Sequence, residues 1–347
     1  MKKTELQDYK EIIDNSLKQL QKLHNKTVFI TGATGFIGSS FVKTILYYNN
    51  SSEANITIVA LVRDINKAET LFSCLSSKNL YLIKGSVETL PQINYHIDYI
   101  IHGASITSSA DFVSKAVDTI LTNVTGTENI LNLAKEKNVK SVLYLSTMEV
   151  YGAINSNNKK IAENDYGYID VVNVRNSYPL SKQMAENLCV AYAEQYNVNV
   201  KIARLTQTIG PNIDYNDSRI AAMFARSVIE GKDIVLNTKA ATTRNIVYIN
   251  DAISAMLFLL VKGESGQTYN VAQSKEVLSI AETAKMIASK IAKNKIEVVF
   301  DIKEMKEYAI NKELYLHLDT TALEKLGWQA KIDTEEAYRR MIKGMME

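Results

Sequence analysis

Residues 28–38 read VFITGATGFIG, an apolar run that passes directly into a glycine-rich turn. The run predicts a buried strand, and a helix beginning near Phe36 would point its free N–H groups and the positive end of its dipole at a phosphate group. Glycines would let the backbone approach such a ligand closely. The spacing is GxxGxxG, and the alternative interpretation is a strand that ends in a flexible turn. The stretch predicts a dinucleotide site formed by Gly32, Thr34, Gly35, Phe36, Ile37 and Gly38.

Apolar strands alternate with helical segments along the first 205 residues. Strands are expected at 27–31, 56–62, 80–83, 98–101, 141–145 and 199–204, and helices at 36–48, 66–76, 112–137 and 178–196. This alternation is typical of an α/β fold with a doubly wound parallel (Rossmann) sheet and helices on both faces. Helices expected at 220–230, 251–261 and 279–291 mix with short strands and predict a smaller C-terminal substrate lobe.

A chain of 347 residues is long for one compact domain, and we expect two lobes behind an N-terminal helix. The expected division is 1–25 for the helix, 26–205 for the dinucleotide-binding domain with a return segment near 246–271, and 206–245 with 272–347 for most of the substrate-binding lobe. Loops at 153–175 and 211–218 follow predicted strand ends, where an open α/β sheet binds its ligand. These loops are candidate substrate contacts.

Charge and cysteine content exclude several classes of function. Basic and acidic residues are interspersed, and a net charge of +2 gives no electrostatic footprint for nucleic acid or an acidic membrane. Two cysteines and four histidines stand outside any metal-ligand spacing, so neither a metal site nor a disulfide framework is expected. The sequence shows neither an apolar stretch of about 18 residues nor a signal peptide, which predicts a soluble, cytoplasmic protein.

Residues 5–23 predict one amphipathic helix before the nucleotide-binding core. Its apolar residues recur at spacings of three and four, and its polar face is mixed in charge. We therefore expect the helix to pack on its own subunit or at a dimer contact, in preference to a membrane surface.

Tyr178 and Lys182 lie four residues apart at the start of a predicted helix, hence on one face. An ammonium group stabilises a phenolate, so we expect Lys182 to lower the pKa of Tyr178 from about 10 toward neutrality and make it a general base for a sugar or alcohol hydroxyl. An ordinary solvated pair is the alternative for this pattern alone. Upstream, Ser146 and Thr147 end a predicted strand, where a hydroxyl can hydrogen-bond the reacting oxygen.

With these features in this order, residues 26–330 resemble the extended short-chain dehydrogenase/reductase family, specifically its NAD-dependent epimerase/dehydratase branch, which acts on nucleotide sugars. Segments similar to motifs of that branch are IHGAS at 101–105, NVTGT at 123–127, RLTQTIGP at 204–211 and TRNIVYIND at 243–251. The resemblance implies cofactor contacts from His102, Ala104 and Asn123, besides Tyr178 and Lys182. It implies substrate contacts from Ser105, Thr147, Arg175, Gln207, Arg219 and Arg244.

The resemblance also implies roles in catalysis. Tyr178 would remove a hydroxyl proton while hydride passes to a nicotinamide, Thr147 would polarise the oxygen, and Lys182 would hold phenol and ribose. Glu149 is a further expected catalytic residue, because family members that dehydrate or decarboxylate carry a glutamate there; a carboxylate that only fixes the loop is the alternative. Met148 stands where the dehydratases carry an aspartate, which weakens a 4,6-dehydratase interpretation.

The predicted function is that of a NAD(P)-dependent nucleotide-sugar enzyme, an epimerase or uronate decarboxylase, working through transient oxidation at C4. The segment RNSY at 175–178 is similar to that of uronate decarboxylases. Alternatives are an NADPH-dependent reductase of a keto-sugar nucleotide and, in another class, a non-catalytic dinucleotide sensor. The two long helices at 112–137 and 178–196 correspond to those that pair in dimeric relatives, so a homodimer is expected by resemblance.

The sequence leaves NAD and NADP as equal alternatives. Arg63 with Lys67 could hold a 2′-phosphate, at a place where relatives that bind NAD often carry an acid, whereas Asp64 could serve NAD. Ser86, followed by Val87, replaces an aspartate that many relatives place near the adenine. These residues complete the expected cofactor site.

Overall fold

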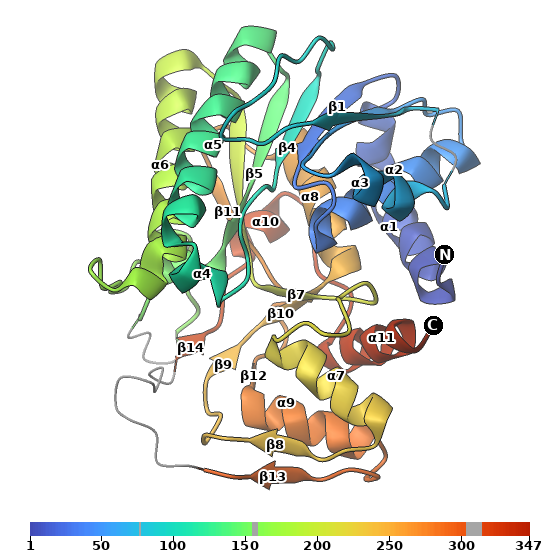
Figure 1. The fold of residues 1–347 in the computed structure, drawn as a ribbon, viewed down its shortest axis with the longest axis vertical. Coiled ribbons are helices and arrows are strands. Elements are labelled where there is room, and N and C mark those ends of the chain that lie inside the picture. The colour runs from blue at the N-terminus through green and yellow to red at the C-terminus, as the bar shows by residue number, and fades with distance from the viewer. Residues whose placement is uncertain (76–77, 155–158, 303–313) are drawn as a thin grey trace.

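The computed structural model describes residues 1–75, 78–154, 159–302 and 314–347. Its centre is a seven-stranded sheet of order β11-β6-β5-β4-β1-β2-β3 (Figure 1). All neighbours in this sheet are parallel, so the predicted doubly wound fold is confirmed. The strands are β1 (Thr27–Thr31), β2 (Thr57–Val62), β3 (Leu80–Lys84), β4 (Tyr99–His102), β5 (Ser141–Thr147), β6 (Val200–Leu205) and β11 (Thr268–Val271).

Helices cover both faces of the sheet, which explains why the inner strands are apolar runs with no alternation. One face packs against α2 (Phe36–Ser51), α3 (Ile65–Phe72) and α8 (Ile249–Lys262). The other packs against α5 (Ala116–Lys137) and α6 (Ser177–Tyr196). The strand β3, at the edge, is only partly buried.

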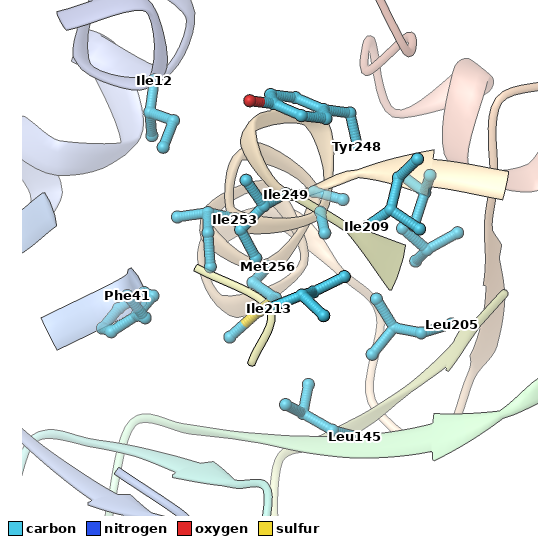
Figure 2. Packing of buried hydrophobic residues seen from close by; sticks show 14 of the residues in the cluster. Ile12, Phe41, Leu145, Leu205, Ile209, Ile213, Tyr248, Ile249, Ile253 and Met256 are labelled. Carbon is cyan, nitrogen blue, oxygen red and sulfur yellow. The ribbon is translucent and has the colours of Figure 1, made fainter. Parts of the chain in front are cut away.

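The predicted N-terminal helix is α1 (Lys3–Lys22), and it packs on its own subunit against α2, α8 and the C-terminal helix. Figure 2 shows Ile253 and Met256 of α8 at the centre of a buried cluster, with Ile12 of α1 and Leu145 of β5 on opposite sides. Residues 249–260 of α8 are all buried, so the helix is covered on every face and most of its side chains are apolar.

Two expected helices differ from the structure. The helix expected at 112–137 is broken into α4 (Asp111–Ser114) and α5 by Lys115, whose backbone is not helical. No glycine or proline marks this break; the Ser177 hydroxyl holds the carbonyl of Phe112 at 2.8 Å and fixes α4 separately. The helix expected at 279–291 is α9 (Ile280–Met286) followed by a π-helical turn over Ile287–Ile291.

The helix expected at 66–76 ends earlier, because α3 stops at Phe72. Its last expected residue, position 76, lies outside the described residues. The other expected helices are present within a few residues of their predicted bounds.

After β6 the chain leaves the large sheet and builds smaller layers below it, although α8, β11 and α10 return to the large sheet (Figure 1). There β7 (Gln207–Ile209) pairs in parallel with β10 (Ile246–Tyr248). A second sheet has β9 (Thr243–Arg244) between β12 (Leu278–Ser279) and β14 (Tyr315–Leu316), and a third pairs β8 (Ile234–Leu236) with β13 (Val298–Phe300). The remaining helices are α7 (Ile220–Glu230), α10 (Thr321–Lys325), which lies beside the large sheet, and α11 (Thr334–Met346).

None of the helices in the described ranges has the length and apolar character needed to cross a bilayer.

Candidate active site

Thr147, Tyr178 and Lys182 meet at the carboxyl edge of the large sheet. Thr147 is the last residue of β5, and Tyr178 and Lys182 lie in the first turns of α6, which packs beside that strand. The hydroxyl of Thr147 hydrogen-bonds the phenol of Tyr178. Both α6 side chains are buried, so the three groups form a protected cluster below the loops that follow β5.

The expected lowering of the Tyr178 pKa is wrong for this arrangement. Burial raises the pKa of the phenol above its ordinary value, the charge of Glu149 raises it further, and the Thr147 hydrogen bond only partly opposes them. Lys182 does not act on the phenol, because its ammonium donates to the carbonyl oxygen of Leu145 at 2.8 Å and lies over the ring of Tyr144. Tyr178 is therefore protonated at neutral pH in this state.

A buried ion pair, which the sequence did not indicate, supports this cluster. Glu186, one turn beyond Lys182, accepts hydrogen bonds from Arg204 at 2.6–3.2 Å and from the hydroxyl of Ser146 at 2.5 Å. Arg204 is 2% exposed and also donates to the carbonyl of Glu163 at 2.7 Å. The pair joins α6, β5 and β6 to the loop that covers the site.

The charge of Glu186 also acts on Lys182. Burial lowers the pKa of Lys182 to about 8, and Glu186 opposes that shift. The ammonium form is still favoured at neutral pH, but by much less than for an exposed lysine.

Glu149 and Arg175 form an ion pair of 3.1 Å beside Tyr178. Glu149 lies in the 3₁₀ turn Met148–Tyr151, just before the expected substrate loop at 153–175, and Arg175 lies in the 3₁₀ turn Val174–Asn176 where that loop ends. The ion pair therefore joins the two ends of one expected substrate loop. Both side chains are half exposed, which leaves them accessible to a ligand.

Phe112 is a further site residue that sequence reasoning missed. Its ring stacks on that of Tyr178 with centroids 4.3 Å apart and planes within 4°, and the Arg175 guanidinium lies 4.9 Å from its centroid. The only sequence signal was an apolar residue inside an expected helix, which does not distinguish a core position from a site position.

The glycine turn has the close packing that a pyrophosphate site requires. Gly32 has φ +72°, and a Cβ there would lie 2.6 Å from the carbonyl oxygen of Gly103 at the end of β4. A Cβ on Gly38 would lie 2.2 Å from the oxygen of Gly32. The helix α2 begins at Phe36 behind Gly35, as predicted, so its free N–H groups point out of this turn. The turn therefore fits a dinucleotide pyrophosphate, with Thr34 and Ile37 placed in or next to it.

His102 and Asn123 hold strand ends and loops together. Both ring nitrogens of His102 have hydroxyl partners, Thr31 at 2.7 Å and Thr127 at 3.1 Å, and burial lowers its pKa to about 3, which keeps it neutral. Asn123 donates to Ser181 of α6 at 2.9 Å and accepts from Ser105 at 2.8 Å. These contacts support the cofactor region, and any contact of His102 or Asn123 with a ligand stays a prediction.

Ala104 takes part in the same junction through its backbone, since its N–H donates to the Thr31 hydroxyl at 3.2 Å. Residues expected at the ribose lie at the ends of β2 and β3. Asp64 caps α3 by accepting the N–H of Lys67 at 3.0 Å, while Arg63 is exposed.

Ser86 and Val87 follow β3. The Ser86 hydroxyl bonds that of Thr89 at 2.9 Å, and Val87 is buried against Gly126 of α5, where a Cβ would lie 2.6 Å from it. Val87 therefore fixes the distance between the loop and α5.

Arg244 and Gln207 line one pocket of the smaller lobe. The pocket is closed by Phe224 of α7 and by Tyr338 of α11. Within the described ranges the Arg244 guanidinium has no hydrogen bond or ion pair, and burial lowers its pKa. A half-buried guanidinium with no partner among the described residues is a favourable site for an anion such as a diphosphate.

Arg219, in contrast to Arg244, has a charged partner. Three hydrogen bonds of 2.6–3.0 Å tie its guanidinium to the carboxylate of Asp217, and it is exposed. Its charge nevertheless lowers the pKa of Tyr178, so it lies within electrostatic range of the catalytic cluster.

Comparisons with known proteins agree with this geometry. The description "NAD dependent epimerase/dehydratase family" matches residues 28–272. UDP-glucuronic acid decarboxylase 6 of Arabidopsis thaliana is 29% identical over 320 residues, which cover 91% of this chain and 88% of the relative.

Two solved structures share the fold. The UDP-N-acetylglucosamine 4-epimerase of Methanobrevibacter ruminantium, in complex with UDP-N-acetylmuramic acid, is similar with a TM-score of 0.78 and 19% identity, covering 92% of this chain and 98% of that one. RMD from Pseudomonas aeruginosa, complexed with NADPH, has a TM-score of 0.71 and 21% identity, with 92% and 99% covered. The glycine turn, the cluster at the sheet edge and these matches lead to one conclusion: the chain belongs to the NAD-dependent epimerase/dehydratase family.

Proposed function

We propose that the protein is a nucleotide-sugar uronate decarboxylase that oxidises C4 of its substrate transiently. The observation that carries the proposal is the ion pair of Glu149 and Arg175 beside Tyr178, with Met148 where a dehydration acid would stand. Arg175 offers a cation for the uronate carboxylate, and Glu149 orients it. The decarboxylase relative, which aligns along 91% of this chain, supports the same choice.

The reaction balances with the groups present. Tyr178, as its phenolate, would take the proton of the C4 hydroxyl, and NAD(P), when bound, would supply the acceptor for the C4 hydride and its source on return. The C4 ketone is β to the carboxylate carbon, so the electron pair of the C5–C6 bond would move toward the ketone oxygen and CO2 would leave. C5 would then take a proton from solvent, and Tyr178 would give its proton back to the C4 oxygen as the hydroxyl is restored.

The proposed reaction must account for the raised pKa of Tyr178. The phenol must become a better base when a ligand is bound, and Thr147 already lowers its pKa by a hydrogen bond. Lys182 is close enough in sequence and packing to leave the Leu145 carbonyl and bond to phenol or ribose, which would add a second lowering effect.

The substrate diphosphate is proposed to bind at Arg244 and Gln207. Arg244 is the unpaired guanidinium of the lobe pocket, and Gln207 begins the strand that runs beside β10. We propose a homodimer as the working unit and UDP as the nucleoside diphosphate, the latter on the basis of the named relatives.

The test uses UDP-glucuronate labelled with ¹³C at C6. We expect one labelled CO2 for each UDP-pentose formed, with NAD present in less than stoichiometric amount, and no product from Tyr178→Phe. An epimer formed without CO2 would contradict decarboxylation and favour the epimerase.

A second candidate is the NADPH-dependent reductase. Exposed Arg63 favours it, because Asp64 is engaged as the cap of α3. Release of the nucleotide from denatured protein, identified by mass, and the stoichiometry of NADPH consumption would distinguish this reaction from a redox-neutral one.

A further inference from the structure

The inner face of α1 buries carboxylates. Glu5 is 4% exposed and Asp8 is 2% exposed, although a helix that only covered an apolar surface would need no charge there. A buried carboxylate is costly unless it is fully hydrogen-bonded. The hydrogen-bond partners of these two carboxylates therefore show which parts of the protein α1 fixes in place.

Glu5 reaches the loop that follows β7. The amide of Asn212 donates to its carboxylate at 2.6 Å, and so do Lys43 of α2 at 3.2 Å and Tyr9 at 2.9 Å. The ammonium of Lys2 donates to the carbonyl of Pro211 at 3.1 Å. The start of α1 thus joins the loop to the cofactor-side helix α2.

Asp8 reaches β10 and α11. The phenol of Tyr248, the last residue of β10, donates to it at 2.8 Å, and Arg340 of α11 lies at 3.3 Å. Arg340 also bonds Glu11 at 2.6 Å, and Asn250 at the start of α8 donates to Glu11 at 3.1 Å. The helix α1 therefore binds β10 and α11 of the smaller layers and, through Glu11, the start of α8.

These partners are next to the walls of the Arg244 pocket. Tyr248 lies four residues beyond Arg244, and β10 pairs with β7, which begins at Gln207. Tyr338, which closes the pocket, lies two residues before Arg340 on the same helix. Movement of β10, of the loop or of α11 would change the shape of the pocket.

We propose that α1 is a clasp that fixes the walls of the Arg244 pocket, and that Asp8 is its central positioning residue. The clasp sets the affinity of the pocket for a nucleoside diphosphate and leaves the dinucleotide turn unaffected. The identity of the ligand rests on the proposed function; the mechanical role does not.

The experiment compares Asp8→Asn with Asp14→Asn, an exposed position on the same helix. Binding of UDP and of NADH is measured by calorimetry at pH 8, above the pKa of about 7 to which burial raises Asp8. We expect Asp8→Asn to weaken UDP binding about tenfold, because the pocket walls are no longer held in place, with NADH affinity unchanged. Asp14→Asn should behave as wild type. Equal weakening of both ligands, or of neither, would overturn the proposal.

Hydrogen exchange of the ligand-free protein gives a second readout. Asp8→Asn should speed exchange at the amides of β10 and α11, which Asp8 contacts through Tyr248 and Arg340, and unchanged exchange there would overturn the clasp. Should Asp8→Asn fail to fold, Tyr248→Phe removes a single hydroxyl and should change UDP binding and exchange in the same direction. Wild-type protein that binds no UDP would count against the proposed function, and exchange alone would then decide on the clasp.

Discussion

At the scale of single residues, we expect Lys182 to make NADH affinity depend on pH. A lysine is charged below its pKa, and burial has lowered that of Lys182 to about 8, so its ammonium is lost as the pH rises through about 8. If the ammonium holds the ribose, NADH affinity should fall over the same range. Fluorescence titrations between about pH 6.5 and 9.5 measure this, with Lys182→Arg as the variant that keeps its charge. A parallel decline in that variant would assign the effect to another group.

Glu186 gives a prediction about stability. Glu186→Gln leaves Arg204 buried without its counter-charge, and loss of one partner of a buried ion pair typically costs about 3–5 kcal/mol. Urea unfolding should show a loss of this size. Glu194→Gln, on the exposed part of the same helix, should leave the midpoint unchanged. Equal midpoints for both variants would mean that the pair contributes nothing.

The sequence predicts those site residues that are brought together within one short segment or at one edge of the sheet. Tyr178 and Lys182 meet because one helical turn separates them, and Thr147 joins them because parallel strands end at one edge. Phe112 and Arg204 could not be found in this way, since their partners lie 66 and 18 residues away in the sequence and are chosen by packing. The pKa of Tyr178 was mispredicted for a related reason, because burial and Glu149 outweigh a lysine that bonds elsewhere.

At the scale of elements, two glycines of the turn should differ in their effects on stability and on NADH binding. A Cβ on Gly38 would meet the carbonyl oxygen of Gly32 at 2.2 Å, so Gly38→Ala should lower stability by about 1–3 kcal/mol and weaken NADH binding as well. A Cβ on Gly35 would lie 3.3 Å from the same oxygen, which is tight without overlap, so Gly35→Ala should cost less stability than Gly38→Ala and should lose NADH affinity by blocking the approach to α2. Thermal melts with NADH titrations check both; a stable Gly38→Ala would contradict the packing argument.

The spacing of apolar residues predicts some of the helices and strands and does not predict others. The strands of the large sheet were predictable because buried parallel strands are continuous apolar runs between turn residues. The break at Lys115 and the π turn at Ile287–Ile291 were not, since neither interrupts the apolar spacing and neither contains a glycine or proline. The short strands β9, β12 and β14 likewise depend on each other and not on their own composition.

For the whole molecule, the outer surface of α5 and α6 predicts a homodimer. Apolar side chains there are well exposed, at 67% for Val117, 47% for Leu121 and 52% for Met184. A double variant, Val117→Glu with Met184→Glu, should raise the dimer dissociation constant by at least about tenfold, because buried charges without partners oppose association. Light scattering after gel filtration measures the mass. Val299→Glu, exposed on β13, is the matched control, and a wild-type monomer would contradict the prediction.

The placement of α1 has a consequence for biosynthesis. The helix is made before Tyr248 and Arg340, the partners of its buried carboxylate Asp8, which lie 240 and 332 residues further along the chain. The helix must therefore wait in solvent while the strands between them assemble, and it docks fully only after residue 340 has been made. Chains that stop before residue 340 should expose α1 to proteases, whereas chains that include α11 should resist cleavage there. Protection of α1 from proteolysis would thus report that the chain has folded through α11.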